Sequence, residues 1–359
     1  MSCFEPLSES PTIDDGFPLG SAALHPDWPE GRFTVSGMFS CDPGILFFLK
    51  IAELGFGCRV GIEAVHGAPF VLWNGGRLDA SLEFNPANLV ARLDSINSQG
   101  LGCFLTFTNH LLEPGDLDDP ACNLLLDGIA LRPDLNGVIV NSDMLSRYIA
   151  RRYPGLRQIA SVTKVVAEGG RGNVSYYNEL GKRFYRYVVH LDDCQDRRLL
   201  DQLDRTKAEI IVNENCSRGC QRRARHYELT AQLQKFLRDR RLIAAGGPGD
   251  ALLRRRRAER ELEEFMADCP ARWLDHQIHQ RSRSCNLTRR ELKSLYDMGF
   301  RYFKIQGRDN IPYCFAYDLT RYTLEPGFAA PFVYKILCAV ILRSLTAAQG
   351  QAPQGPVRQ

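Results

Sequence analysis

Short apolar runs alternate along this chain with longer segments whose apolar residues recur at helical spacing. The short runs predict strands, and the amphipathic segments between them predict helices. Strands are predicted at residues 60–65, 70–73, 103–109, 137–143, 158–163, 186–191, 209–213 and 301–306. Helices are predicted at residues 44–54, 87–98, 144–153, 175–184, 197–204, 252–266 and 288–298.

This regular alternation predicts an α/β protein with a TIM-like (β/α)8 barrel. The chain lacks a glycine-rich dinucleotide fingerprint, which disfavours an open nucleotide-binding sheet. Residues 43–346 are assigned to the barrel, residues 1–42 to an irregular N-terminal extension and residues 347–359 to a disordered tail. Residues 221–284 exceed the usual length of a barrel loop and are predicted to form an insertion at the barrel mouth.

The composition is that of a globular protein, since 44% of the 359 residues are hydrophobic. The net charge of +3 is too small to indicate a nucleic-acid partner. Arg254–Arg257, followed by several glutamates, predicts a solvated helix or, alternatively, an anion or RNA contact over the mouth. The N-terminus shows no secretory signal, and Lys335 and Arg343 interrupt the apolar window at residues 329–345. A cytoplasmic protein without a membrane span is therefore expected.

Two cysteines follow the predicted strand at residues 209–213, where barrel proteins place their chemistry. Cys216 and Cys220 are separated by three residues. The twelve cysteines of the chain are irregularly spaced, which predicts reduced thiols, most of them in the core, rather than a disulfide framework. Two thiols at one strand end indicate a metal site, and the alternative is a pair of small buried turn residues.

Polar side chains at the other strand ends would share the same mouth. The predicted substrate-binding residues are Arg77, Asn109, Asn141, Thr163, His190, Asn213 and Arg308, and the predicted catalytic residues are Glu214, His226, Lys304 and Gln306. Arg77, Lys304 and Arg308 would bind a carboxylate or phosphate of an acidic small molecule, or else close the barrel through salt bridges. Glu214 is either a general base or a capping residue, and His226 either carries protons or packs on its helix.

Several segments resemble the collagenase-like peptidase family (peptidase family U-thirty-two), across roughly residues 60 to 310. They are the closing run Asp297–Arg308, which ends in Lys-Ile-Gln-Gly-Arg, the glycine-rich strand end Asn74–Arg77, and the strands within Gly137–Met144, Ile159–Thr163 and Tyr185–Leu191. The resemblance implies a barrel fold. It also implies a [4Fe–4S] cluster, as in family members that hydroxylate RNA bases or the ubiquinone ring without molecular oxygen.

The resemblance implies that the cluster ligands are Cys216, Cys220, Cys269 and Cys285, with Cys194 as a rival ligand. Zinc is the alternative metal for such thiolates. The family's signature glutamate is replaced here by Gln306, so the chain resembles a divergent branch.

Three functions are consistent with the sequence. The leading hypothesis is an iron-sulfur barrel enzyme that performs a redox or hydroxylation-type reaction on a small molecule, peptide or nucleobase. The second is a peptidase or other hydrolase, although the chain has neither a G-x-S-x-G nor an H-E-x-x-H motif. The third is a non-catalytic protein partner of a related family member.

Overall fold

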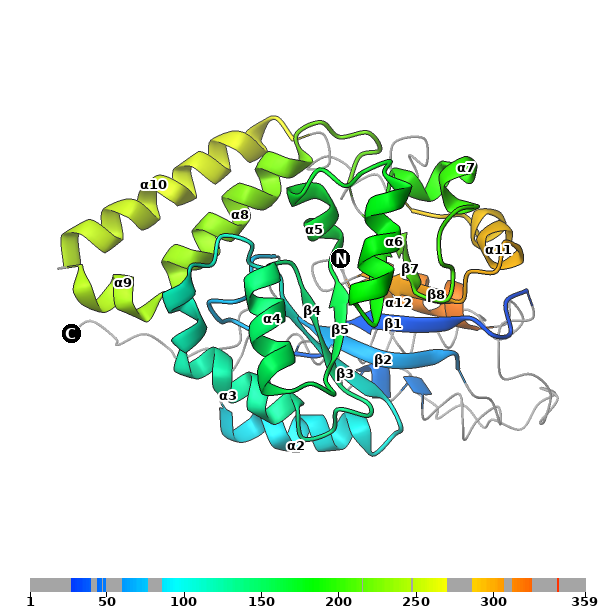
Figure 1. The fold of residues 1–359 in the computed structure, drawn as a ribbon, viewed down its shortest axis with the longest axis horizontal. Helices are drawn as coiled ribbons and strands as arrows, with labels where there is room; N and C mark the ends of the chain where they lie inside the picture. Colours follow the sequence, from blue (N-terminus) through cyan, green and yellow to red (C-terminus); the bar gives the residue numbers. More distant parts are fainter. Residues whose placement is uncertain are drawn as a thin grey trace, which may run out of the picture.

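Eight parallel strands form a closed barrel in which each strand pairs with its neighbours in sequence and β1 pairs with β8 (Figure 1). The computed structural model describes residues 27–39, 44–46, 48–49, 60–76, 86–214, 216–246, 248–269, 286–306, 312–324 and 341. The strands are β1 (Arg32–Ser36), β2 (Ile62–Gly67), β3 (Gly102–Phe107), β4 (Gly137–Val140), β5 (Arg157–Ala160), β6 (Arg186–Val189), β7 (Ala208–Asn213) and β8 (Tyr302–Ile305). The predicted TIM-like barrel is confirmed.

The first strand differs from the prediction. β1 lies within the segment that the sequence analysis assigned to an irregular extension, and the predicted strand at residues 70–73 is wrong. Residues 70–73 form turns, in which Val71 N–H donates to Pro69 O and Asn74 N–H to Val71 O. Their apolar side chains serve packing rather than strand pairing, since Trp73 contacts the ring of Phe107 edge-on.

Helices connect the strands and cover the barrel. They are α2 (Pro86–Asn97), α3 (Pro120–Ile129), α4 (Asp143–Arg152), α5 (Val162–Ala167), α6 (Val174–Arg183), α7 (Arg197–Leu200), α8 (Arg223–Arg238), α9 (Arg240–Ala245), α10 (Pro248–Ala267), α11 (Arg289–Asp297) and α12 (Pro312–Thr323). The predicted helices that became α2, α4, α6, α10 and α11 are confirmed. Of the predicted helix 44–54, the described residues 44–46 and 48–49 are helical.

Several predicted boundaries are wrong, because the strands predicted at 103–109, 137–143 and 186–191 end at Phe107, Val140 and Val189. The strand predicted at residues 158–163 ends at Ala160, because Ser161 caps α5 by accepting a hydrogen bond from Thr163 N–H. The helix predicted at 197–204 ends at Leu200. Capping by Ser161 thus ends β5 and begins α5 earlier than the apolar pattern indicates.

The segment predicted as an insertion contains three successive helices. α8, α9 and α10 form a helical arm that extends from one end of the barrel (Figure 1). Residues 270–285 of the predicted insertion lie outside the described residues, as do residues 1–26 and the predicted tail at 347–359. Of the apolar window at 329–345, only Ile341 is described. Within the part of the chain that the structure describes, no helix is long and apolar enough to cross a membrane.

Apolar side chains form two cores, one inside the barrel and one between the barrel and the helices. One cluster comes from alternate residues of neighbouring strands and consists of Ala64, Phe104, Ile139, Ile159, Val188, Leu191 and Ile211. Residues between these positions, such as Val138 and Val140, belong to the larger cluster that packs against the helices. Strand alternation therefore gives one core inside the barrel and one around it.

The carboxyl ends of β7 and β8 are joined by one asparagine. Asn213 Oδ1 accepts from Gln306 N–H at 2.7 Å, and its Nδ2 donates to Gln306 O and to Asp318 Oδ2, both at 2.8 Å. The strand register shifts beside it, between Ile211 and Asn213. Such an irregularity bends a strand end, and the Asn213 amide supplies the hydrogen bonds that the shifted ladder lacks.

Burial raises the pKa of Asp318 from 3.8 to about 6, although Asn213 and Arg321 oppose the shift. Asp318→Asn is therefore expected to raise the free energy of unfolding by up to about 3 kcal/mol at neutral pH, at about 1.4 kcal/mol per pKa unit. Below about pH 4 the carboxyl is protonated in both the folded and the unfolded chain, so the gain should vanish. As the pH rises from about 4, Asp318 ionises first in the unfolded chain, so the free energy of unfolding of the wild-type protein falls. The fall ends once the pH has passed the pKa of Asp318 in the folded chain.

Urea unfolding of the wild-type and Asp318→Asn proteins across this pH range measures the difference. Asp94→Asn, at an exposed position of α2, serves as the matched control and should change stability little at any pH. A stability difference for Asp318→Asn that does not depend on pH would contradict the raised pKa.

Candidate functional site at the barrel mouth

A cavity of about 100 Å³ lies where the carboxyl ends of the strands converge. It is lined by His66, Gly75, Gly76, Thr106, Thr108, Ile139, Ser161, Val162, Thr163, Val188, Ile211, Glu214, Cys216, Arg223, His226, Tyr227, Thr230, Lys304 and Gln306. Four of these residues, from Arg223 to Thr230, come from α8 and close one side of the mouth. Since a water molecule occupies about 30 Å³ of liquid, the cavity accommodates a small molecule or one end of a larger one.

Six residues predicted from the sequence line this cavity. They are Thr163, Glu214, Cys216, His226, Lys304 and Gln306. Lys304 is buried within β8, and His226 faces the cavity from the first turn of α8. The barrel mouth therefore brings together cationic and hydrogen-bonding side chains from three distant parts of the chain, as predicted from the position of the strand ends.

Besides Asn213, which joins β7 to β8, two predicted asparagines at strand ends are used in the framework. Asn109 Nδ2 donates to Leu72 O at 3.1 Å and to Ala231 O at 3.4 Å, which fastens α8 to the barrel. Asn141 Nδ2 donates to Thr163 Oγ1 at 2.9 Å and so positions a hydroxyl of the cavity wall. Neither asparagine belongs to the cavity lining.

The glycines of the predicted motif at residues 74–77 are required by close packing. A Cβ atom on Gly75 would lie 2.6 Å from Asn109 Cα, so this position accepts no side chain. Asn74 Oδ1 accepts from Gly76 N–H at 3.1 Å and fixes the turn. Arg77, the last residue of this predicted motif, lies outside the described residues, as do Arg308 and Cys285.

Arg223 is the centre of a buried polar cluster that the sequence analysis did not predict. Only 2% of its side chain is exposed. Its guanidinium donates to Cys216 Sγ at 3.4 and 3.5 Å, to Ser217 O at 2.8 Å and to Asp192 Oδ2 at 3.0 Å, and it lies 2.8 Å from His190 Nε2. One cation thus links the ends of β6 and β7 to the beginning of α8.

The electrostatics of this cluster follow from burial beside a fixed positive charge. Burial lowers the pKa of His190, and the charges of Arg223 and Arg171 lower it further, so the imidazole is neutral. Burial acts to raise the pKa of Asp192, but the Gly219 N–H and Arg223 outweigh it and keep the carboxylate ionised. His190, predicted to bind substrate, is therefore a neutral partner of Arg223 outside the cavity lining.

The turn between Cys216 and Cys220 is held by the same cluster. Gly219 has a φ of 64°, which favours glycine, and its N–H donates to Asp192 Oδ1 at 2.9 Å. Burial raises the pKa of the Cys216 thiol, while Arg223 opposes the shift. Asp192 therefore anchors both the turn and the arginine that contacts the sulfur.

Described residues that are close in sequence to the predicted cluster ligands make contacts at the end of β7 and the beginning of α8. Arg222, which follows Cys220, donates to Phe265 O at 2.6 Å and to Asp268 O at 2.9 Å, immediately before Cys269. Glu214 N–H, two residues before Cys216, donates to Asn286 Oδ1 at 2.7 Å. Asn286 is the residue after Cys285 in the sequence.

The described thiols have different surroundings. Cys216, Cys220 and Cys269 are partly exposed, whereas the rival ligand Cys194 is buried in the core beside β6. Among the described residues, which exclude Cys285, no three His, Cys, Asp or Glu side chains are grouped closely enough to hold a metal ion. A complete ligand set would therefore need Cys285 and a closer approach of the described thiols.

The chain was compared with protein families, curated proteins and solved structures. No protein-family model matches this chain, and no curated protein matches it. The chain is similar to a structure described as the U32 peptidase Mk0906, with a TM-score of 0.45 and 12% sequence identity, over 80% of this chain and 94% of that chain. At this identity the similarity concerns the fold alone.

The sequence held a weak signal for Arg223. Arg218, Arg222, Arg223 and Arg225 all lie within the stretch after the ligand strand, and spacing alone does not separate them. Only the fold shows that Arg223 points inward, whereas Arg225 pairs with Glu228 and Glu261 at the surface.

Proposed function

We propose that this protein is an enzyme that holds a [4Fe–4S] cluster at its barrel mouth and performs a redox or oxygen-independent hydroxylation-type reaction on a small molecule. Two contacts between residues that neighbour these cysteines in the sequence support the proposal: Arg222 bonds to Phe265 O and Asp268 O, and Glu214 N–H bonds to Asn286 Oδ1. Four thiolates are the ligand set of such a cluster. Zinc is the alternative occupant of the same donor set.

The surroundings of Cys216 fit a thiolate ligand. Arg223 directs two N–H groups at its sulfur, and hydrogen bonds from outside the ligand set stabilise a charged thiolate and orient it. Because burial raises the pKa of this thiol, the free chain holds it protonated, and metal binding would release the proton. A cluster bound there would supply electron transfer next to the cavity.

The side chains that line the cavity indicate the chemical class of the substrate. Lys304 and Arg223 place two cationic side chains at its wall, which favours a substrate or cosubstrate with an acidic group. Hydroxyls of Thr106 in β3, Thr108 just after it and Thr163 in α5 also line the cavity and offer hydrogen bonds. Glu214 and His226 are the side chains that could accept or carry a proton at this wall.

The test is the metal content of protein purified without oxygen. We expect about four irons and four acid-labile sulfides per chain, with a brown colour. Alanine at Cys216, Cys220, Cys269 or Cys285 should each remove most of the iron. Cys122→Ala, which changes a buried core thiol of α3, is the matched control and should leave the iron content unchanged.

Other outcomes would redirect the assignment. About one zinc per chain, or a folded protein without metal, would contradict the cluster. Loss of iron in Cys194→Ala but not in Cys269→Ala would show that Cys194, rather than Cys269, is a cluster ligand. Peptide cleavage that survives Cys216→Ala and Cys220→Ala would favour the peptidase hypothesis. Iron binding without activity in the isolated chain, with co-purification of a related protein, would favour the partner hypothesis.

A further inference from the structure

The tip of the helical arm combines an apolar groove with a concentration of positive charge. The groove has a volume of about 530 Å³ and its apolar walls are Phe236, Leu237, Ile243, Ala244, Ala251 and Leu252. It lies between the end of α8, α9 and the beginning of α10, away from the cavity at the barrel mouth. None of the residues that line it also lines that cavity.

Large apolar side chains around this groove remain exposed. Ile243 is 55% exposed, Leu252 44% and Leu253 64%. Exposed apolar residues are common singly, but three within two adjoining helices, next to a groove, form a patch. Burying such a patch against a partner would be favourable.

Arginines surround the same patch. Residues 240–257 contain six arginines and one aspartate; Arg241 and Arg255 are paired with carboxylates, and Arg240, Arg254, Arg256 and Arg257 are exposed. Arg256 and Arg257 stand one helical turn after Leu252 and Leu253, so each leucine has an exposed arginine beside it on α10. Arg255 lines the groove and pairs with Glu259 at 2.8 Å.

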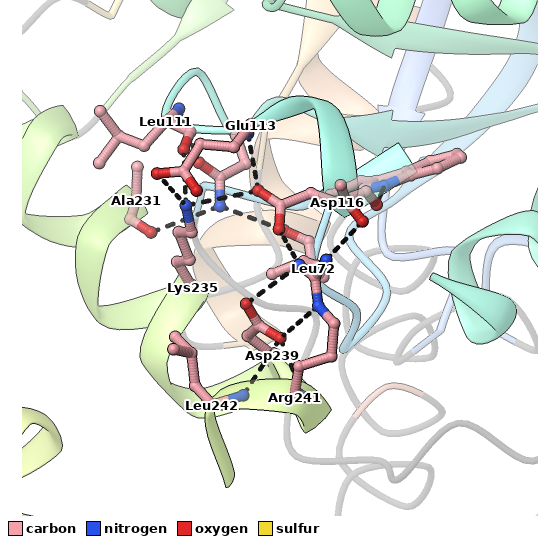
Figure 2. A network of polar contacts seen from close by, with 12 residues as sticks. Leu72, Leu111, Glu113, Asp116, Ala231, Lys235, Asp239, Arg241 and Leu242 are labelled. Atoms are coloured by element: carbon pink, nitrogen blue, oxygen red, sulfur yellow. Dashed lines mark hydrogen bonds and ion pairs between the residues drawn. The ribbon is translucent and has the colours of Figure 1, made fainter. Parts of the chain in front are cut away.

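Ion pairs hold the arm against the barrel just before the tip (Figure 2). Lys235 Nζ lies 3.2 Å from Glu113 Oε1 and 3.4 Å from Asp116 Oδ2, and Arg241 bonds to both Asp116 and Asp239. The side chain of Asp116 is only 1% exposed. These contacts fix α8 and α9, which form two walls of the groove, and a fixed wall lowers the entropy cost of binding.

We propose that the arm tip is a docking site for an acidic amphipathic helix of a partner protein. The apolar face of such a helix would enter the groove, and its carboxylates would pair with Arg254, Arg256 and Arg257. RNA is less well matched, since the exposed side chains of the patch are aliphatic rather than aromatic stacking surfaces. A membrane is flat, whereas this apolar surface is concave.

The test uses the full chain and a labelled synthetic peptide of about 18 residues, with leucines at helical i, i+3, i+4 and i+7 spacing and glutamates elsewhere. Fluorescence anisotropy should show that this peptide binds, whereas a matched peptide with lysines in place of glutamates does not. Binding should weaken with added salt. Leu252→Asp, and separately the combined change of Arg254, Arg256 and Arg257 to glutamate, should each weaken binding by about tenfold or more.

Arg151→Glu, at an exposed position of α4, is the control and should leave binding unchanged. Circular dichroism should show all variants folded. Equal binding of both peptides, or binding that survives the arm variants, would overturn the proposal. Three other results would overturn it if the acidic peptide does not bind. They are a dimer of this chain, binding to an RNA oligonucleotide and binding to anionic vesicles, each abolished by Leu252→Asp. Cys216→Ala should still bind the peptide, so a failure of the cluster assignment would leave this result intact.

Discussion

Arg223→Ala is expected to lower the free energy of unfolding by about 3 kcal/mol, the largest effect among single charge changes at the barrel mouth. The substitution removes hydrogen bonds to Cys216, Ser217 and Asp192 and the contact with His190 in one step. Removing one partner of a buried charge pair leaves the other charge without compensation. Asp192 would keep its ion pair with Arg171, at 2.9 Å, which limits the loss.

Denaturant unfolding of Arg223→Ala, Arg223→Lys and Arg151→Ala measures this effect. Arg223→Lys keeps the charge but not the planar fork of donors, so we expect a loss between those of the other two variants. Arg151, exposed on α4, should tolerate alanine. If Arg223→Ala were as stable as Arg151→Ala, Arg223 would not organise the mouth.

Trp73→Ala is expected to cost about 4 kcal/mol of unfolding free energy, the usual range for removing a buried tryptophan ring. Trp73 has no exposed surface, and its ring packs edge-on against Phe107 at 5.2 Å and Tyr148 at 5.9 Å. Its Nε1 donates to Asp116 O at 2.8 Å. Trp73 also precedes the Gly75 and Gly76 turn that forms part of the cavity wall.

Trp73→Phe separates the ring from its hydrogen bond. This variant keeps an aromatic ring in the same place and loses the N–H donor, so we expect a cost of about 1 to 2 kcal/mol. Thermal and denaturant unfolding of the two variants gives the comparison. Equal losses for Trp73→Ala and Trp73→Phe would assign the effect to the hydrogen bond rather than to packing.

The barrel was predictable because most strands are short apolar runs separated by amphipathic helices. β1 was missed because residues 32–36 mix charged, hydroxyl and apolar side chains in a segment otherwise rich in proline and glycine. The opposite error occurred at residues 70–73, where Val71, Leu72 and Trp73 are buried without joining the sheet and Phe70 is exposed. Local pattern does not distinguish pairing from packing in so short a run.

The candidate site was predictable to the extent that chemistry lies at strand ends. Glu214, Lys304 and Gln306 follow this rule and line the cavity. Asn109 and Asn213 also lie at strand ends, yet their amides bond to framework groups, which depends on loops that the sequence pattern does not position. Arg223 was missed because sequence spacing does not distinguish it from Arg218, Arg222 and Arg225.

The pairing of β1 with β8 has a consequence for the synthesis of the protein. The barrel closes only after Ile305 has left the ribosome, because this residue pairs with Val35. Until then, the nascent chain exposes two open sheet edges, which are templates for wrong pairing. At usual rates of translation this interval lasts on the order of tens of seconds, so the seven earlier strands must be protected from association during that time.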